Sequence, residues 1–302
     1  MDRREFIGTL MAGYLSGLLV KRDPIDGLSS IVSWVKNQNA FFQRKIALNH
    51  IVDLDKPVQI YAGKNQLAIA AGKKNGLSPY LENAGFSFSN LVSTNLKGKV
   101  SFETLPPTHD RLIIDKEKEL ILLGGPVANS LGGLILGYDY DKLDDGTRFP
   151  KFESNELRWG FYCGDIMYGG YGGKIEKAKR FEGGMLVDRP LYAIHDKTVS
   201  DIIRFKRDSD GFLQNEVLLV TKKPNPYNED YSVFVIGGMH GYSIDEFSSN
   251  IYANIYKLKD KIQRHRSYQI YIPVNLTHDK DMDYKITKAF LDWEKLQFEA
   301  FD

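Results

Sequence analysis

Residues 233–241 read VFVIGGMHG, and residues 120–129 read LILLGGPVAN. In both places four apolar residues end in a Gly pair and lead into a stretch that suits a helix. A short apolar run bounded by turn residues is typical of a strand that is buried on both faces. A strand that passes through glycine into a helix brings backbone N–H groups and a helix N-terminus to one point, which favours anion or nucleotide binding. The two stretches therefore predict a fold class and the place of a ligand.

The segments around these runs predict an alternation of strands and helices. Further strands are expected over residues 57–62, 100–105, 216–221 and 268–274, and helices over about 29–50 and 284–298. Residues 77–85 are expected to form a short helix or a turn. A helix is also expected from about Ile244 to Leu258, because Ser243 and Glu246 have the spacing of a capping box. Strand, turn and helix in repeated order indicate an α/β layered fold with a mostly parallel or mixed sheet.

Residues 137–216 interrupt this alternation. They contain a cluster of aspartates over 139–145 and a Gly-rich and Tyr-rich stretch over 160–173. Such composition favours hairpins and loops over helices. The aspartate cluster lacks the twelve-residue spacing and the final Glu of an EF-hand, so we interpret it as a solvated turn. The sequence thus predicts one α/β domain over residues 24–302, with a Gly-rich β or loop insertion at about 137–216.

Composition excludes several classes of protein. The chain has 302 residues, 42% of them hydrophobic and 26% charged, which is typical of a globular protein. The formal net charge is +1, so no overall field favours nucleic acid or an anionic membrane. The single cysteine, Cys163, excludes an intramolecular disulfide and a Cys-rich zinc site. No metal site is predicted, and the sequence leaves the cofactor and the oligomeric state open.

The N-terminus has the features of an export signal. Arg3 and Arg4 precede Phe6 and Ile7, and a mostly apolar run continues to Val20. The run is shorter than the ~20 residues that span a membrane. Residues 1–23 therefore resemble a twin-arginine export signal, which implies an exported protein or one tethered to a membrane by this segment. The alternatives are a short amphipathic helix and a cytoplasmic protein, because Asp2 stands where the signal usually has Ser or Thr and a clear cleavage site is lacking.

The first Gly pair belongs to a turn that could cradle a ligand. Gly124 and Gly125 permit a close approach to the backbone, and Pro126 suits the first turn of a helix. Asn129 can cap that helix or donate to a sugar. The spacing departs from the dinucleotide fingerprint G-x-G-x-x-G. The alternative is a tight turn without a ligand.

The second Gly pair adds a side chain suited to chemistry. His240 lies between glycines after a predicted strand, where open α/β sheets bind their ligands. An imidazole there can act as an acid or base, with Glu246 or Asp245 as its acidic partner. The predicted ligand contacts of this turn are Gly237, Gly238, Gly241 and Ser243. The alternative is a histidine that only bonds a neighbouring loop.

Two familiar motifs fail at named residues. The turn resembles G-x-H-G-x-E of zinc carboxypeptidases, but Ser243 stands where Glu would ligate zinc. Residues 169–174 read GGYGGK, yet Tyr168 takes the place of the first P-loop glycine and Ile175 that of Ser or Thr. Neither a zinc peptidase nor a P-loop enzyme is predicted.

Several motifs together resemble those of uncharacterised bacterial and archaeal α/β proteins. These motifs are LLGGPxxN, LVTKxPNP, VIGGxHG and YQIYIPV, and they fall between Leu112 and Val274. The resemblance implies a Rossmann-like fold and no established activity.

Three functional hypotheses follow. The first is a protein that binds a nucleotide, a sugar phosphate or a similar small molecule between the two Gly turns. The second is a hydrolase or glycosyl-transfer enzyme that uses His240. The third is a purely structural or interaction role, which the composition does not exclude.

Overall fold

The computed structural model describes a large part of the chain. The described residues are 43–53, 55–64, 78–95, 99–104, 114–126, 128–142, 148–162, 178–182, 185–189, 193–199, 202–206, 214–238, 241–263, 265–279 and 285–301. The chain divides into two compact units, residues 1–46 and 47–302. The predicted signal segment lies outside the described residues.

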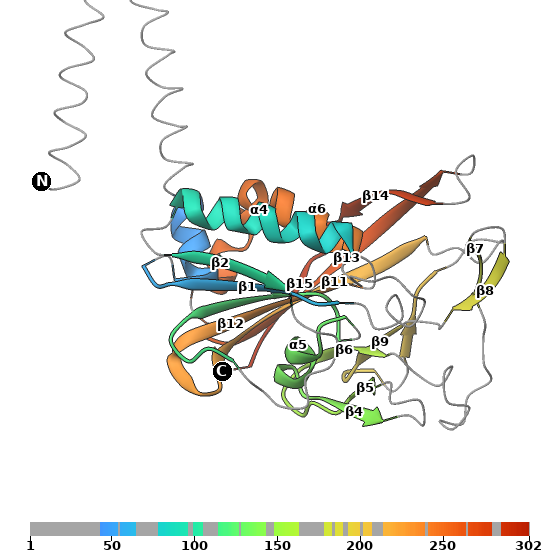
Figure 1. The fold of residues 1–302 in the computed structure, drawn as a ribbon, viewed down its shortest axis with the longest axis horizontal. Helices are drawn as coiled ribbons and strands as arrows, with labels where there is room; N and C mark the ends of the chain where they lie inside the picture. The colour runs from blue at the N-terminus through green and yellow to red at the C-terminus, as the bar shows by residue number, and fades with distance from the viewer. Residues whose placement is uncertain are drawn as a thin grey trace, which may run out of the picture. The chain divides into compact units, whose positions relative to one another are not determined.

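A mixed sheet of eight strands forms the centre of this unit (Figure 1). Its strand order is β14-β13-β11-β12-β3-β1-β2, and β15 also pairs with β13. The strands are β1 (Val58–Ala62), β2 (Val100–Thr104), β3 (Glu119–Leu123), β11 (Asn215–Asn225), β12 (Asn228–Gly238), β13 (Tyr268–Asp279), β14 (Lys285–Leu291) and β15 (Gln297–Ala300). The predicted α/β fold with a mixed sheet is confirmed.

The apolar runs at residues 120–123 and 233–236 form neighbouring parallel strands. β3 pairs with β12 from Leu120 opposite Val233 to Leu123 opposite Ile236. All five residues of β3 are buried. A strand covered on both faces needs apolar side chains at every position, which explains the unbroken run. β1 and β2 continue the parallel part of the sheet, since β1 pairs with both β3 and β2 in parallel.

The other half of the sheet is antiparallel. β11 and β12 form a hairpin that closes where Asn225 pairs with Asn228. Asn225 is fully buried, and its side chain accepts from Tyr227 N at 3.1 Å and donates to the Asp115 carbonyl at 2.8 Å. Residues 224–228 read PNPYN, and this Pro-rich and Asn-rich composition favours such a turn. β11 therefore lies between β12 and β13, and it is antiparallel to both.

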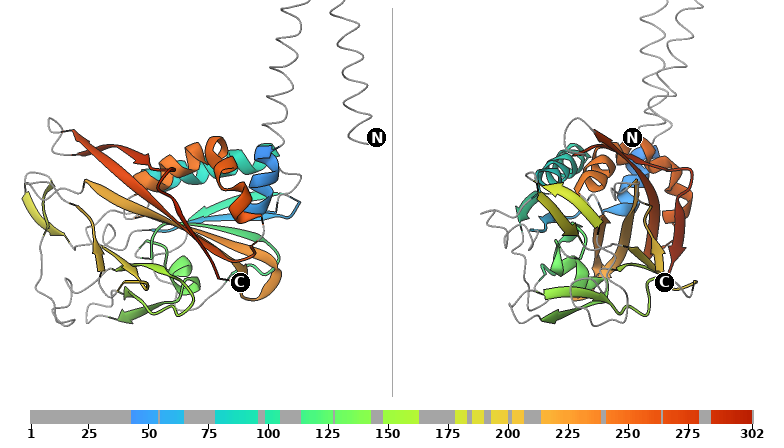
Figure 2. Two further views of the ribbon diagram at one scale, coloured as in Figure 1. Left: turned by 180° about the vertical axis from the view of Figure 1, so that it is seen from behind. Right: turned by 90° about the vertical axis from the view of Figure 1, so that its right-hand side faces the viewer.

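Two helices cover one face of the sheet (Figures 1 and 2). They are α4 (Pro79–Asn95) and α6 (Gly241–Asn254), and the rings of Phe88 and Phe247 lie 6.4 Å apart between them. The short helix α5 (Ser130–Ile135) lies across the sheet from them (Figure 1). After α6 the chain forms a 3₁₀ turn, η1 (Ile255–Lys257), and a short helix, α7 (Lys259–Ile262). Phe247, Ile251, Ile255 and Leu258 share the helical spacing of one apolar face, and all four are buried.

The described residues of the predicted insertion form three small antiparallel sheets. They are β4 (Tyr138–Lys142) with β5 (Arg148–Phe152), β7 (Ala178–Glu182) with β8 (Met185–Arg189), and β9 (Ala193–Asp196) between β6 (Trp159–Tyr162) and β10 (Ile202–Arg204). The predicted hairpin character of this segment is confirmed. The main sheet resumes with β11 at Asn215.

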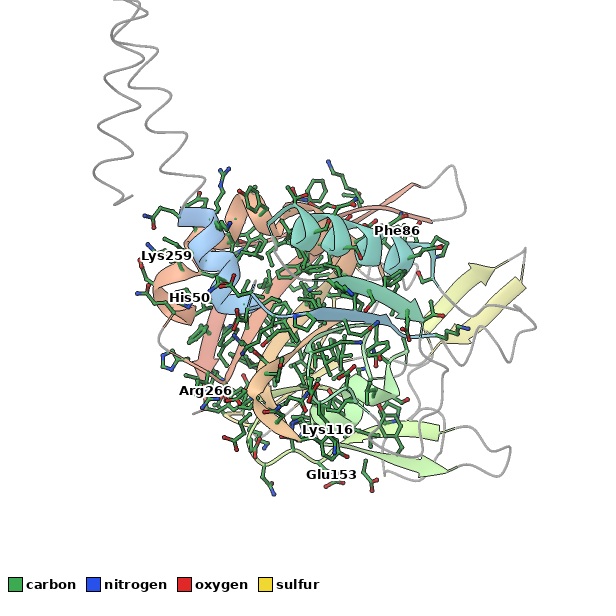
Figure 3. The ribbon with its side chains drawn as sticks, turned by 60° about the vertical axis from the view of Figure 1, so that its left-hand side comes forward. His50, Phe86, Lys116, Glu153, Lys259 and Arg266 are labelled. Atoms are coloured by element: carbon green, nitrogen blue, oxygen red, sulfur yellow. The ribbon has the colours of Figure 1, made fainter. Side chains whose placement is uncertain are left out.

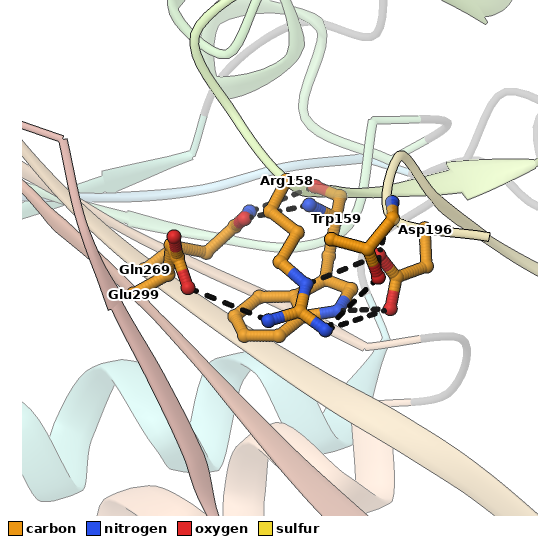
Figure 4. A network of polar contacts seen from close by, with 6 residues as sticks. Arg158, Trp159, Asp196, Gln269 and Glu299 are labelled. Carbon is orange, nitrogen blue, oxygen red and sulfur yellow. Dashed lines mark hydrogen bonds and ion pairs between the residues drawn. The ribbon is translucent and has the colours of Figure 1, made fainter.

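A buried polar network joins β6 to the main sheet (Figure 4). The Gln269 side chain accepts from Trp159 N at 2.9 Å and donates to the Trp159 carbonyl at 2.8 Å. The indole N–H of Trp159 donates to Asp196 at 3.0 Å. Arg158 donates to the same carboxylate at 3.1 Å and reaches Glu299 at 3.4 Å. One amide side chain thus satisfies both backbone groups of a buried residue, as a neighbouring strand would.

Two sequence predictions are wrong. The predicted helix over 284–298 is replaced by β14 and β15, which pair with the two ends of β13. The apolar spacing of residues 284–298 suits both a helix and a strand. Pairing with β13 selects the strand. In addition α6 begins at Gly241, so Ser243 lies inside its first turn and is not the capping residue of a box with Glu246.

Candidate functional site

The structure brings the two predicted Gly turns together. β3 and β12 are parallel neighbours, so both turns lie at the carboxyl edge of the sheet. Gly125 faces the second turn directly, because a Cβ added to it would lie 2.9 Å from the carbonyl oxygen of Gly238. A Cβ on Gly237 would lie 3.0 Å from the Phe161 ring. The glycines therefore allow two backbones and one aromatic ring to pack closely.

Three N–H groups of the first turn are bonded within the protein. Gly124 has a φ of 119°, which favours glycine, and its N–H donates to the Ile236 carbonyl at 3.0 Å. The N–H groups of Ala128 and Asn129 both donate to the Gly125 carbonyl, at 2.9 and 2.8 Å. These donors hold the turn in shape and link it to β12.

Asn129 and Pro126 also have partners within the protein. The Asn129 side chain caps α5 by accepting from Gly132 N at 2.9 Å, and it donates to the Leu123 carbonyl at 3.1 Å. The predicted capping role is therefore confirmed. The Pro126 carbonyl accepts from the Tyr140 hydroxyl at 2.8 Å, which ties the turn to β4.

The second turn leads directly into α6. Gly241 packs against α4, because a Cβ on it would lie 2.7 Å from Cβ of Tyr80. Ser243 is fully buried. Burial raises the pKa of the Asp245 carboxyl, which Asn83 opposes by a hydrogen bond, and burial also raises the pKa of Glu246. His240 lies outside the described residues, so its predicted pairing with either carboxylate stays a prediction.

Other candidates from the sequence also fall outside the described residues. They are Cys163, the GGYGGK stretch over 169–174, and Asp144 and Asp145 of the aspartate cluster. Of that cluster, Asp139 is exposed and accepts from Tyr140 N at 2.8 Å. The assignment of a ligand to the Gly turns thus rests on the sequence argument alone.

A cavity that the sequence did not predict lies at the opposite edge of the sheet. It has a volume of about 330 Å³ and lies at the amino ends of β3 and β12, and we call it the amino-edge cavity. Figure 3 labels His50 and Arg266, two of its lining residues. Its ionisable lining residues are His50, Asp53, Lys56, Glu119, Lys222, Glu229, Asp230, Tyr231, His265 and Arg266. All of them belong to the unit of residues 47–302.

Glu119 is the buried carboxylate of this cavity. It is the first residue of β3, and its side chain is only 3% exposed. The carboxylate accepts from the Ser232 hydroxyl at 2.8 Å and from Ser232 N at 3.3 Å. Burial raises its pKa, while Ser232 and the nearby Lys222 and Lys56 act in the opposite direction. Glu119 is therefore easier to protonate than an exposed glutamate.

Lys222 is the partly buried amine of the cavity. It lies on β11, and its ammonium donates to the His50 carbonyl at 2.6 Å. Desolvation lowers its pKa, the carboxylates of Glu119 and Asp53 raise it, and the cations Lys56 and Arg266 lower it again. Within the described part of the chain Lys222 forms no ion pair closer than 4.0 Å. Its charge is thus incompletely compensated by the protein.

Two further cations border the cavity. Lys56 pairs with Asp53 at 3.1 Å, lies 3.8 Å from Glu119, and donates to the Asp230 carbonyl. Arg266 donates to the Glu229 carbonyl at 2.7 Å. Three cationic side chains therefore converge on one small space, and each of them donates to a neutral carbonyl group.

The sequence contains a signal for this cavity that is easy to miss. Lys222 and Lys223 are consecutive in a strand, so their side chains point to opposite faces. Lys223 forms an ion pair with Glu156 at 2.6 Å, while Lys222 lines the cavity. Glu119 precedes four buried apolar residues, although the charged stretch KEKE over 116–119 by itself favours a turn. A charged residue at the first position of a buried strand is the pattern that indicates this cavity.

These features define a mixed α/β protein with a charged cavity at one sheet edge. Comparison with family models, curated proteins and solved structures finds no match for this chain. Among the described residues, no helix is long and apolar enough to cross a membrane. The same residues contain no group of three His, Cys, Asp or Glu placed to hold a metal ion.

Proposed function

We propose that this chain binds a small anionic molecule, such as a sugar phosphate, nucleotide or carboxylate, in the amino-edge cavity. The observation that carries this proposal is the convergence of Lys56, Lys222 and Arg266 on one space. Each cation opposes the charge of the others there. A bound anion would relieve that repulsion and occupy the donors that Lys222 and Arg266 retain.

The partial burial of Lys222 decides how strong such binding can be. Two opposite unit charges ~4 Å apart attract by about 1 kcal/mol in water but about 4 kcal/mol at the effective dielectric of a protein surface. An anion beside Lys222 would gain the larger benefit, because this amine is withdrawn from solvent. Glu229 and Asp230 also border the cavity, but both residues are exposed, which screens their charges.

Calorimetric titration with inorganic phosphate and with glucose 6-phosphate tests this proposal. Losing one charge-assisted hydrogen bond costs ~1.5–3 kcal/mol, so Lys222→Met and Arg266→Met should each weaken binding by about 10- to 100-fold. Lys223→Met is the matched control, because its ammonium pairs with Glu156 outside the cavity. Unchanged affinity in Lys222→Met, or an equal loss in Lys223→Met, would refute the assignment.

A second candidate function concerns the carboxyl edge. There His240 would act as acid or base in a hydrolase or glycosyl-transfer reaction, with Glu246 or Asp245 as its partner. The supporting observation is that burial raises the pKa of both carboxyls, so each accepts a proton more readily than an exposed carboxyl does. The Gly turns would then hold the substrate. A thermal-shift screen against nucleotides and sugars, repeated on His240→Ala, tests this candidate, and shifts that are identical in both proteins would argue against it.

We also propose that the parallel half of the sheet has a Rossmann-like arrangement. Its support is the parallel order β2-β1-β3-β12 and the helix α4 between the parallel pair β1 and β2. This is the connectivity that nucleotide-binding α/β sheets use.

We also propose export through residues 1–23. The support is the Arg3-Arg4 pair followed by a short apolar run. Fusing residues 1–30 to a reporter tests the signal, and Arg3→Lys with Arg4→Lys should abolish export of the fusion. Export that continues unchanged in the double variant would exclude a twin-arginine signal.

A further inference from the structure

We propose that Lys222 is a nucleophilic amine that forms a reversible imine with the aldehyde or ketone group of a small anion bound in the amino-edge cavity. The inference rests on the proposed anion binding for the placement of the substrate. The substrate class is a small carbonyl compound that carries a carboxylate or a phosphate.

The position of the amine suits this chemistry. Lys222 lines the cavity from β11, and one of its N–H groups is fixed on the His50 carbonyl at 2.6 Å. A neutral amine retains a second N–H and a lone pair. Because the His50 contact uses only a donor, the lone pair stays available to a molecule in the cavity.

The surroundings of the amine make its ammonium easier to deprotonate than that of an exposed lysine. Partial burial penalises the ammonium, and the cations Lys56 and Arg266 repel it. The carboxylates of Glu119 and Asp53 act in the opposite direction, and the overall effect is a lowered pKa. Desolvation and neighbouring cations are the two means by which lysines become nucleophiles.

Glu119 supplies the proton that the reaction needs. It faces the same cavity, and its burial and its bonds from Ser232 hold a carboxyl group whose pKa is raised. The amine nitrogen attacks the carbonyl carbon, and a proton passes from nitrogen to the new alkoxide to give a carbinolamine. The carboxyl of Glu119 then protonates the hydroxyl, water leaves, and the remaining N–H proton returns to the carboxylate. One amine and one carbonyl thus give one imine and one water, with no redox change.

Lys56 and Arg266 define the rest of the substrate. Both lie at the cavity beside Lys222 and would hold the carboxylate or phosphate while the carbonyl meets the amine. A small anionic carbonyl compound meets both requirements at once. A neutral aldehyde would lack the anchoring group and should react more slowly.

Reductive trapping on the full chain tests the inference. The protein is incubated near neutral pH with glyoxylate and cyanoborohydride, which turns an imine into a stable carboxymethyl-lysine, and the modified residue is located by peptide mass spectrometry. We expect Lys222 to be modified at least about tenfold faster than Lys223, because only Lys222 is desolvated beside other cations. Lys222→Arg should lose the adduct, and Lys223→Arg should keep it.

Two further arms separate this inference from the proposed function. Inorganic phosphate should slow trapping at Lys222 and leave Lys223 unaffected. Glu119→Gln should slow trapping and flatten its dependence on pH, while phosphate affinity persists. Equal trapping of Lys222 and Lys223 in a protein that binds phosphate at the cavity would overturn the imine and leave anion binding intact. Selective trapping of Lys222 without phosphate binding would support the amine and overturn the anion site.

Discussion

The effect of a substitution on the stability of this fold depends on whether the buried polar atom that it removes has a hydrogen-bond partner. The hydroxyl of Tyr268 is fully buried and has no hydrogen-bond partner among the described residues. Burial also raises its pKa, so the phenol stays neutral. By contrast, the hydroxyl of Tyr138 accepts from Phe161 N at 2.5 Å. The hydroxyl groups of these two buried tyrosines therefore contribute differently to the stability of the fold.

Tyr268→Phe should leave stability unchanged or raise it. Removing an unpaired buried hydroxyl releases a desolvation cost, so we expect a gain of about 0–1 kcal/mol in the free energy of unfolding. Tyr138→Phe is the matched comparison, and it should lose about 1–3 kcal/mol because Phe161 N is left unpaired. Urea unfolding at neutral pH measures both. A clear loss in Tyr268→Phe would indicate a partner for its hydroxyl.

At the scale of elements, an amide side chain makes the backbone hydrogen bonds of a neighbouring strand where two sheets meet. β6 pairs with β9, and where it meets the main sheet at Trp159 the Gln269 side chain supplies the donor and the acceptor. The hairpin of β11 and β12 is closed in a similar way by the buried Asn225. Amide side chains suit this role because each carries both a donor and an acceptor.

Gln269→Ala should loosen β6 more than it disturbs the main sheet. It leaves the buried N–H and carbonyl of Trp159 unpaired, at a cost of about 2–4 kcal/mol. Hydrogen exchange should show faster exchange at Trp159 N and little change in β3. Gln297→Ala is the control, because Gln297 is exposed on β15. Protection of Trp159 N that survives in Gln269→Ala would show that another group holds β6.

At the scale of the whole molecule, the β6-β9-β10 sheet is joined to the core by charge as well as by packing. Asp196 accepts from Arg158, from the Trp159 indole and from Thr198. Burial alone would raise the pKa of Asp196, but these hydrogen bonds, led by that of Arg158, lower it to about 2. Because the folded-state pKa lies below the unfolded one, Asp196 stabilises the fold above about pH 4. That contribution disappears as the pH falls through about 2.

Stability should therefore fall in acid partly through Asp196. We expect at most about 2 kcal/mol from this group, because Arg158 is partly exposed and solvent screens the pair. Unfolding of the wild type and of Asp196→Asn is compared at neutral pH and at successively lower pH. The difference between them should shrink as the pH drops towards 2. A difference that stays constant over this range would show that the charge of Asp196 is unimportant.

More of the fold than of the candidate site could be predicted from the sequence. Unbroken apolar runs predict buried strands because every residue of such a strand faces other side chains, and β3 and β12 follow that rule. The tail over 284–298 could not be predicted, since its spacing suits both a helix and a strand until β13 offers an edge. The same limit applies to the Gly turns, whose close packing on each other appears only once the strands are neighbours.

The sequence by itself determined the layered α/β class, the buried strands, the cap at Asn129 and the hairpins of the insertion. These depend on side-chain polarity and backbone preference, which act over a few residues. Only the tertiary structure decided that Gly125 packs against Gly238 and that Lys56, Glu119, Lys222 and Arg266 line one cavity. These groups are far apart along the chain, and their charges interact only because the antiparallel strand β11 brings its carboxyl end to the edge where β3, β12 and β13 begin.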